Sequence, residues 1–462
     1  FASRSVAGGP FASPAAPVNP FDPVALASAN RPASRTPFSN DFASPQPTTA
    51  GGFQTGTSRA SSSPFGASQP SVLNADPILA GIAQDLDALE DETGTRVDVS
   101  TGYRDRSGEA GLSGLSELSG SAEVSTGFAG GRISAKAHAV SVDAGEADVN
   151  SLLKFGRNGL LQARGIIAEA EAELADPGAQ HEAGVELSAG FKNDWFGVDV
   201  GTTPLGFEEV QMQGGLEFTP RLSRYASARL WFERRPVTDS VVSYAGATDP
   251  VTGEFWGAVM QTGGGLSAAY ERNGTGVYAD ASYYDYAGTN VRSNGRVQLN
   301  AGGYLVAYED NNSTFRLGVN GNFQQFDNNQ NVFTYGQGGY FSPQNFLSVS
   351  FPVSYTYKID RLEAGASITP GYQSYEQDTE PFFPTDPVAQ AELVALRALD
   401  TDVQAFHAGS SQTGFGINLG GTAYYEITPG TRIGGEFSLD TFGEYNEIRT
   451  MLGIRQNFGA SE

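Results

Sequence analysis

Hydrophobic and polar positions alternate along most of the chain after residue 95. In residues 347–357, for example, serine, proline and threonine alternate with Leu347, Val349, Phe351, Val353, Tyr355 and Tyr357. A period of two is typical of a β-strand with one apolar and one polar face. About 16 segments show this pattern: 97–106, 116–128, 132–142, 182–192, 195–201, 209–218, 224–233, 255–270, 276–287, 295–308, 313–326, 344–358, 361–375, 412–427, 431–441 and 445–458.

The connections between these segments alternate in length. Seven are short and rich in turn residues: Ala129–Gly131, Asn193–Asp194, Thr219–Ser223, Glu271–Thr275, Glu309–Asn312, Ile359–Asp360 and Thr428–Gly430. The longest intervening ones are 143–181, 234–254, 327–343 and 376–411. Bacterial transmembrane barrels sort short periplasmic turns from long extracellular loops in this way, and an even strand number returns both chain ends to the periplasm. The sequence therefore predicts an all-β fold, a transmembrane antiparallel β-barrel of about 16 strands in the bacterial outer membrane.

The region before the barrel has a different composition. Residues 1–75 are rich in proline, serine and alanine, which predicts a disordered linker. Residues 76–95 carry isoleucine and leucine at helical spacing and are expected to form a short amphipathic helix. The barrel is then expected over 96–458, followed by a tail, 459–462.

Two of the long connections are predicted to be partly helical. Apolar residues recur at helical spacing in Leu160–Leu174 and in Val388–Leu399. Neither segment is long or apolar enough for a transmembrane helix.

Composition and charge exclude several classes of protein. The chain has 462 residues, no cysteine and three histidines. Disulfide scaffolds, thiol catalysis and cysteine-ligated metals are therefore excluded, and we expect neither a metal site nor a cofactor. The net charge is −24, and residues 1–75 hold 4 Arg and 2 Asp, so the acidity belongs to the rest of the chain. Such a balance argues against binding nucleic acid.

If the apolar face of each strand meets lipid, the polar face lines a lumen. Sixteen strands leave room for an aqueous channel. A phosphate pore would carry rings of lysine or arginine, whereas phenols and amides offer weak, exchangeable contacts to sugar hydroxyls. The polar lumen of any barrel would contain residues like these. The pattern therefore indicates a channel more strongly than it indicates a carbohydrate substrate. The lumen candidates for glycan contact are Arg229, Trp231, Glu233, Tyr278, Tyr284, Tyr304, Asn320, Asn322, Gln324 and Tyr424.

Eight short strings, in order along the chain, resemble one known family. The first is the sequence YRDRSGEAGLS at residues 103–113. The others lie at 142–145, 201–207, 234–240, 243–246, 249–250, 256–257 and 338–344. The ordered set, over roughly residues 90–460, resembles the C-terminal barrel domain of the outer-membrane exporter of the bacterial cellulose synthase machinery, a family of cellulose and exopolysaccharide export porins.

This resemblance implies a barrel that passes a nascent β-1,4-glucan across the outer membrane. The implied partners are the glucan, outer-membrane lipid, a periplasmic tetratricopeptide-repeat region and the inner-membrane cellulose synthase complex. The chain shows no 34-residue helical repeat of its own. Either residues 1–75 join the barrel to missing repeats, or the exporter is split or shortened.

Most of the matching strings fall in the long connections. A structural role is expected for their residues more often than direct contact with the glycan. Arg234, Arg235 and Asp239 are expected to pair and hold loop 234–254 over the pore. The residues expected to form an aromatic exit constriction are Tyr244, Trp256, Tyr340 and Phe341.

These features together predict a passive exopolysaccharide-secretion channel that is not an enzyme. Three alternatives stay open. The first is a general porin for small solutes. The second is an outer-membrane enzyme acting on lipid or glycan, with His138 or a carboxylate as its catalytic group. The third is a surface adhesin or scaffold with a plugged lumen.

Overall fold

The computed structural model describes residues 94–458 except 194, 221, 224 and 429. The predicted linker and tail lie outside the described residues. So does the predicted helix, apart from its last two positions, and there Thr95 already begins the first strand.

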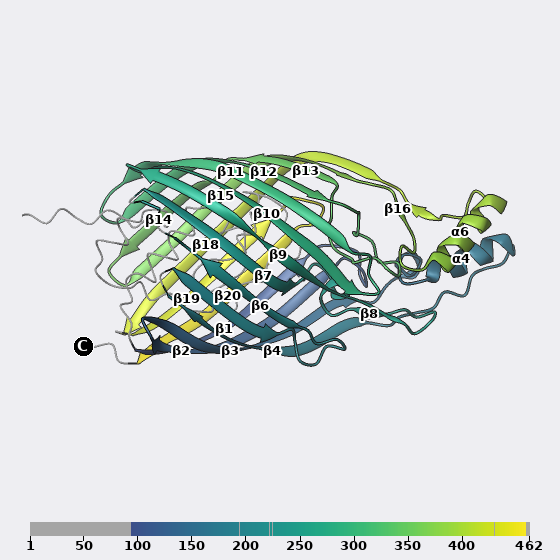
Figure 1. Ribbon diagram of the computed structural model, residues 1–462, viewed down its shortest axis with the longest axis horizontal. Coiled ribbons are helices and arrows are strands. Elements are labelled where there is room, and N and C mark those ends of the chain that lie inside the picture. The colour runs from purple at the N-terminus through teal and green to yellow at the C-terminus, as the bar shows by residue number, and fades with distance from the viewer. Residues whose placement is uncertain (1–93, 194, 221, 224, 429, 459–462) are drawn as a thin grey trace, which may run out of the picture.

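Sixteen antiparallel strands close into a barrel (Figure 1), as the sequence predicts. They are β1 (Thr95–Arg106), β2 (Leu115–Phe128), β3 (Gly131–Gly145), β4 (Gln180–Lys192), β5 (Phe196–Thr202), β6 (Met212–Phe218), β7 (Ala226–Pro236), β9 (Phe255–Arg272), β10 (Thr275–Thr289), β11 (Asn294–Glu309), β12 (Ser313–Phe326), β13 (Asn345–Ser350) with β14 (Val353–Ile359), β15 (Leu362–Gln377), β18 (Ser410–Thr428), β19 (Thr431–Asp440) and β20 (Glu447–Phe458). β13 and β14 are one crossing interrupted at Pro352, which lacks the N–H that a continuous ladder needs. The ring closes because β1 pairs with both β2 and β20.

Alternate residues of each strand face the two sides of the barrel wall. In β1, Arg96, Asp98 and Arg104 are buried on the inner face, whereas Val99 and Tyr103 are exposed on the outer face. The other strands repeat this alternation, so exposed apolar side chains encircle the barrel. A closed ring satisfies its backbone hydrogen bonds internally, as a lipid environment requires. With its apolar outer surface, the barrel is an outer-membrane protein of the bacterial cell.

The two ends of the barrel differ. The short connections lie at one end of the barrel, together with the start of β1 and the last residues of β20. We call this end the short-turn end (Figure 1). The long loops gather at the other, the long-loop end. They contain α3 (Val149–Leu152), α4 (Asn158–Ile167), α5 (Val241–Tyr244), α6 (Pro387–Leu399), β8 (Ala247–Thr248), β16 (Glu380–Pro381) and β17 (Phe406–His407).

The two predicted loop helices are α4 and α6, and α4 ends earlier than the pattern indicates. The start of α6 has a clear local cause. The Asp386 carboxylate accepts a hydrogen bond from the Ala389 N–H at 3.0 Å, and Pro387 occupies the first helical position. Among the described residues, no helix is long and apolar enough to cross a membrane.

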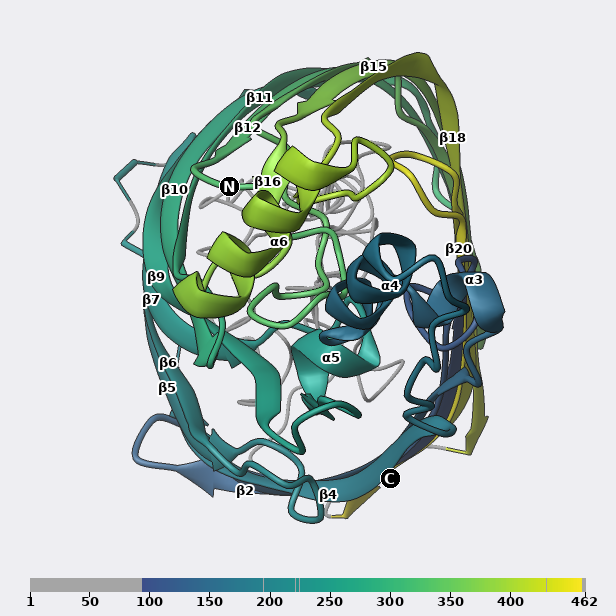
Figure 2. The same ribbon diagram turned by 90° about the vertical axis from the view of Figure 1, so that its right-hand side faces the viewer.

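The long loops form a cap with its own hydrophobic core. Viewed from the long-loop end, α4, α5 and α6 lie across the mouth of the barrel (Figure 2). We define the cap as residues 107–114, 146–179, 237–254, 327–344 and 378–409. One buried apolar cluster joins all five segments: Leu112, Phe155, Leu160, Ala163, Val242, Ala247, Trp256, Phe333, Tyr335, Phe382, Phe383, Ala389, Leu393, Val403 and Ala405.

Candidate functional site

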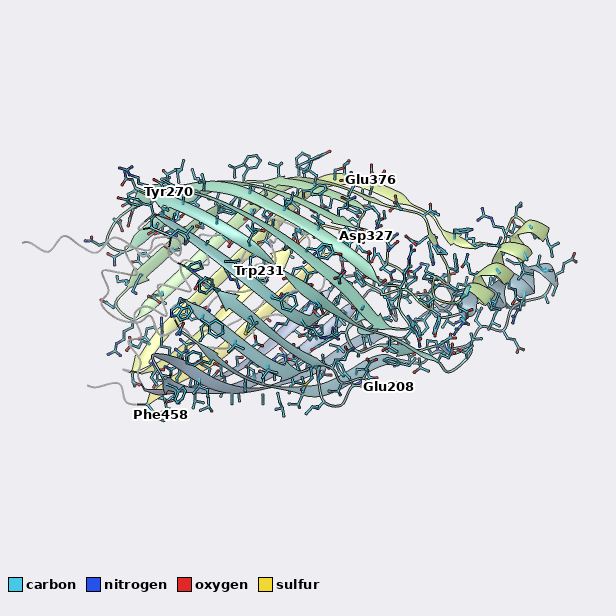
Figure 3. All side chains as sticks on the ribbon, viewed as in Figure 1. Glu208, Trp231, Tyr270, Asp327, Glu376 and Phe458 are labelled. Atoms are coloured by element: carbon cyan, nitrogen blue, oxygen red, sulfur yellow. The ribbon has the colours of Figure 1, made fainter. Side chains whose placement is uncertain are left out.

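All ten lumen candidates lie on the inner face of the wall, on β7, β10, β11, β12 and β18. Trp231 lies midway along the barrel (Figure 3). Its Nε1 donates a hydrogen bond to the Tyr284 hydroxyl at 2.8 Å, and that hydroxyl donates to Glu233 Oε1 at 2.9 Å. These three side chains therefore form a connected network within the wall.

Most of the other lumen candidates also have partners on an adjacent strand or on the next strand but one. Tyr278 donates to Asn320 Oδ1 at 2.8 Å. Tyr424 donates to Glu436 at 2.7 Å, and Tyr304 donates to Glu271. Because a phenol that donates to a carboxylate is held in one orientation, Tyr304 and Tyr424 brace the wall.

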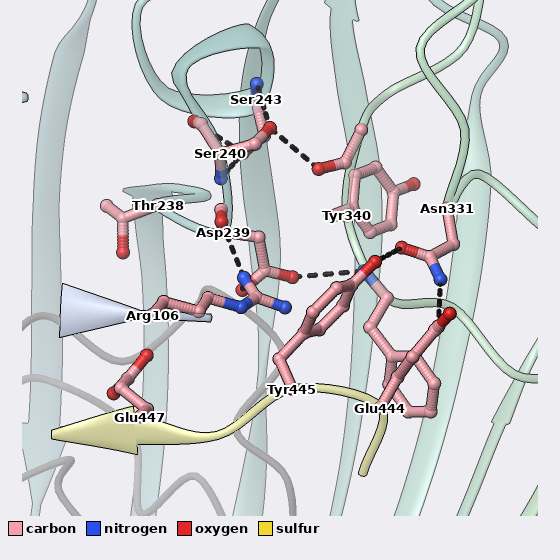
Figure 4. Close-up of polar contacts among 12 residues, drawn as sticks. Arg106, Thr238, Asp239, Ser240, Ser243, Asn331, Tyr340, Glu444, Tyr445 and Glu447 are labelled. Atoms are coloured by element: carbon pink, nitrogen blue, oxygen red, sulfur yellow. Dashed lines mark hydrogen bonds and ion pairs between the residues drawn. The ribbon is translucent and has the colours of Figure 1, made fainter. Parts of the chain in front are cut away.

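One loop segment, residues 237–246, folds into the mouth of the barrel; we call it the inner segment. Its residues from Val237 through Gly246 are buried. Arg106 of β1 pairs with Asp239 at 3.0 Å (Figure 4). Arg104 Nη1 donates to the Thr238 carbonyl at 2.8 Å. Tyr244 donates to Glu186 of β4 at 3.0 Å. The inner segment is therefore anchored to the wall on two sides.

A second loop, 327–344, forms hydrogen bonds with the inner segment. The Ser240 hydroxyl donates to the Gly339 carbonyl at 2.7 Å, and the Phe341 N–H donates to Asp239 Oδ2 at 3.1 Å. Asp239 thus holds both Arg106 and the second loop. Ser240 and Gly339 belong to two of the matching strings and are 99 residues apart in sequence, so the fold brings these strings together.

The expected pairing among Arg234, Arg235 and Asp239 is wrong. Arg235 faces inward and binds Asp199 of β5 at 2.6 Å. Arg234 faces the other side of β7 and donates to Thr262 at 3.0 Å. Strand alternation places the neighbouring Arg234 and Arg235 on opposite faces of β7. Asp239 pairs with Arg106 of β1.

The predicted aromatic constriction is also not formed, because its four residues belong to four separate buried clusters. The Tyr244 ring packs on Phe207, with centroids 5.1 Å apart, and Trp256 packs on Phe155 at 5.2 Å. Tyr340 stacks on Tyr286 at 5.2 Å, and Phe341 packs edge-on against Tyr375 at 5.1 Å. In this conformation these side chains are the cores of the folded loops.

Sequence reasoning missed Arg157, which joins four of the cap segments. Its guanidinium binds Asp249 at 2.7 Å, Glu254 at 2.7 Å and Asp386 at 2.9 Å. It also lies over the ring of Tyr335, 3.5 Å from the centroid. The side chain is only 8 % exposed. No local motif marks this residue, because its partners are far away in sequence.

The long-loop end carries most of the negative charge. The connections 107–114, 146–179, 203–211, 237–254, 290–293, 327–344, 378–409 and 441–446 contain 20 acidic and 5 basic residues, a net charge of −15. Within the described part of the chain, no group of three or more His, Asp or Glu is arranged to hold a metal ion.

Several known proteins are similar to this chain in sequence. A protein from Xanthomonas axonopodis pv. citri (strain 306), "Cellulose synthase operon protein C", is 35 % identical over 293 residues, 60 % of this chain and 19 % of the relative. The protein of the same name from Pseudomonas fluorescens (strain SBW25) is 31 % identical over 416 residues, 89 % of this chain and 30 % of the relative. The chain thus spans less than a third of the length of these relatives.

A solved structure, "Bacterial polysaccharide outer membrane secretin", superposes with a TM-score of 0.49 at 9 % identity, covering 79 % of this chain and 99 % of that one. The family model described as "Cellulose synthase operon protein C C-terminus" matches residues 113–459, which is most of the barrel and its cap. The chain therefore belongs to the Cellulose synthase operon protein C C-terminus family.

Proposed function

We propose that this protein is the outer-membrane channel through which a nascent exopolysaccharide, cellulose (β-1,4-glucan), leaves the periplasm for the cell surface. The observation that carries the proposal is the polar inner wall of a closed sixteen-strand barrel in this family. Hydroxyl and amide side chains both donate and accept hydrogen bonds, so they can exchange partners with a moving glycan. The ten lumen candidates are proposed to shape this path, with Asn320, Asn322 and Gln324 offering amides to the polymer.

Transport in this proposal is passive and needs no catalytic residue. Elongation at an inner-membrane cellulose synthase complex pushes the polymer, and a periplasmic tetratricopeptide-repeat region upstream guides it to the short-turn end. That end faces the periplasm because short turns are periplasmic in bacterial outer-membrane barrels. The cap then faces the cell surface.

The cap implies that export requires a conformational change. Helices α4, α5 and α6 lie across the mouth (Figure 2), and the inner segment is held against the wall by a buried ion pair and hydrogen bonds. In our proposal the arriving polymer displaces the inner segment, and the clustered loop aromatics, including Trp256 and Phe341, hold the rest of the cap in place. The ion pair of Arg106 and Asp239 keeps the path closed between export events.

The test is a deletion of the barrel in cells that produce the polymer. We expect surface glucan to disappear while polymer synthesis in isolated membranes continues. Persisting secretion, or loss of synthesis itself, would contradict the proposal.

Bilayer recordings of the purified protein distinguish a general porin, which would show steady ungated conductance and pass unrelated sugars. Glycan or lipid turnover that disappears on His138→Gln would instead reveal an enzyme.

A further inference from the structure

Two parts of the inner wall of the barrel differ in their chemistry. Each of the strands β1 to β7 and β20 carries buried charged side chains on its inner face. Arg455 binds Asp98 at 2.7 Å, and Arg104 binds Glu447 at 2.8 Å. We call this part the ion-paired wall. The inner segment is anchored here, through Arg104, Arg106 and Glu186.

Strands β12, β13, β14, β15 and β18 form the second part, which we call the neutral wall. The charged residues that face inward on its described strands are Arg316, Lys358, Glu363 and Glu426, and all lie close to the short turns. Above them, the inner face of the neutral wall carries mainly serine, threonine, asparagine, glutamine and glycine.

Several polar groups of the neutral wall have no hydrogen-bond partner within the part of the chain that the structure describes. They are the hydroxyls of Ser348, Ser350, Ser354 and Thr422 and the Nδ2 atom of Asn418. Ser350 is fully buried, and Ser348, Ser354 and Asn418 are at most 2 % exposed. Leaving a buried polar group unpaired costs free energy, so each of these is a position that an incoming donor or acceptor would stabilise.

The unpaired groups of the neutral wall lie on two crossings, β13 with β14 and β18, on either side of β15. Single unpaired atoms also occur on the ion-paired wall, at Glu123 Oε1 and Ser134 Oγ. Ser350 pairs in register with Asn320 on one side and Gly371 on the other, and Ser348 pairs with Asn322. Ser354 pairs with Ser367 of β15, and Thr369 of the same strand pairs with Asn418 of β18. Because residues paired across a ladder share a face, all of them point into the lumen.

We propose that the neutral wall is the binding track of the exported glycan, and that the ion-paired wall is not. This inference rests on the proposed function and adds which side of the lumen the polymer occupies. A neutral polyhydroxyl chain matches groups that both donate and accept, and it needs no counter-charge. The polymer makes a series of single hydrogen bonds to Ser348, Ser350, Ser354 and Asn418 as it moves.

The test uses the absence of cysteine, which makes any introduced thiol unique. Ser367→Cys and Thr422→Cys place thiols on the track, at a position 8 % exposed and a half-buried one. Ser121→Cys on β2, which is 7 % exposed, is the matched control on the ion-paired wall. A small methanethiosulfonate reagent labels each purified full-length variant with and without cellohexaose. At ten times the Kd of cellohexaose, labelling of the track thiols should slow by about tenfold, and labelling of the control should not change.

A second set of variants tests the hydrogen bonds themselves. Replacing Ser348, Ser350 and Ser354 together by alanine removes three hydroxyls, which should weaken cellohexaose binding by at least about tenfold. The paired Ser100→Ala and Ser121→Ala replacement on the ion-paired wall should leave binding unchanged. Fluorescence-detected titration of the purified variants measures both affinities.

Three outcomes would overturn the track: equal protection on both walls, protection of the Ser121→Cys control alone, or track thiols that the reagent does not reach. An unchanged affinity in the triple alanine variant would do the same. Equal protection leaves the proposed function intact, because the barrel would still bind the glycan. If cellohexaose protects no thiol and secretion persists without the barrel, both proposals fail.

Discussion

At the scale of single residues, Arg157 is the clearest case of one side chain organising several loops. Its partner Asp249 is completely buried, and Asp386 is also partly buried. Burial by itself raises the pKa of Asp386. Hydrogen bonds from the Ala389 N–H and from Arg157 outweigh this and hold that pKa below its ordinary value. The guanidinium therefore stabilises charges that the cap would otherwise not tolerate.

Replacing Arg157 by methionine should open the cap. The change leaves Asp249 buried without its counter-charge, which costs about 3–5 kcal/mol. We expect protease added to intact cells to cut within 378–409 many times faster than in the unchanged protein. Arg164→Met is the control, since its pair with Glu392 is half-exposed and worth about 0–1 kcal/mol. Equal cleavage of both variants would contradict this role.

His407 gives the cap a dependence on pH. Its ring stacks on Phe382, with centroids 4.1 Å apart, and its Nε2 lies 3.0 Å from the Thr334 hydroxyl. Burial lowers the pKa of His407 from 6.5 to about 4. The folded cap therefore favours the neutral ring, and its stability falls as the pH drops from about 6.5 to about 4.

Acidification should accordingly loosen the cap, by about 3 kcal/mol once His407 is protonated. Hydrogen exchange of residues 378–409, followed from pH 7 to pH 4, measures the effect. His407→Gln should flatten the profile, whereas His181→Gln should preserve it, because His181 bonds Ser141 at an exposed position. Glu380, paired with His407 in register, has a pKa raised by burial and acts in the opposite sense. Exchange that is independent of pH in the unchanged protein would disprove the role.

At the scale of elements, strands could be predicted from the sequence and loop contacts could not. Alternation is a local property of a pleated strand, so it locates β12 and β18 without knowledge of their neighbours. Asp386 likewise marks the start of α6. In contrast, Arg157 and Asp386 are 229 residues apart. Nothing local indicates that they meet, or that Asp239 binds Arg106 instead of the nearby Arg235.

The lumen candidates show the same division. Their inward direction follows from the period of two, and the structure places all ten on the inner face. The pairing of Tyr424 with Glu436 and of Tyr278 with Asn320 depends on strand register. Register also sets which unpaired groups of the neutral wall lie near one another, which composition alone does not reveal.

The inner segment should leave the wall when its main anchor is removed. In Asp239→Asn, Arg106 remains buried without a full counter-charge, and the hydrogen bond to Phe341 is weakened. We expect longer and larger openings in bilayer recordings. Lys154→Met is the control, because its pair with Glu109 is exposed. Recordings identical to those of the unchanged protein would show that the inner segment does not close the path.

At the scale of the whole molecule, charge is unevenly distributed. The long-loop connections hold −15 of the net −24. Such a field concentrates cations at the mouth and repels anions, and salt screens it with a Debye length of about 10 Å at 0.1 M. The surface opening is therefore better suited to a neutral polymer than to a polyanion.

The open state should consequently prefer cations. In bilayer recordings of Asp239→Asn, the reversal potential in a potassium chloride gradient should show potassium selectivity at about 0.1 M that weakens towards about 1 M. The unmodified protein, recorded during spontaneous openings, is the reference. Anion selectivity, or selectivity that is independent of salt, would contradict the assignment of this charge to the mouth.

The seam of the barrel has one more consequence. β1 and β20 are paired along their full lengths, from Thr95 opposite Phe458 to Arg106 opposite Glu447. Parting them would leave two rows of backbone groups unsatisfied in hydrocarbon, each at a cost of several kcal/mol. A sideways exit into the bilayer is thereby closed to the proposed polymer. In the proposed function, the polymer must travel along the axis of the barrel, and its release to the outside depends on the cap.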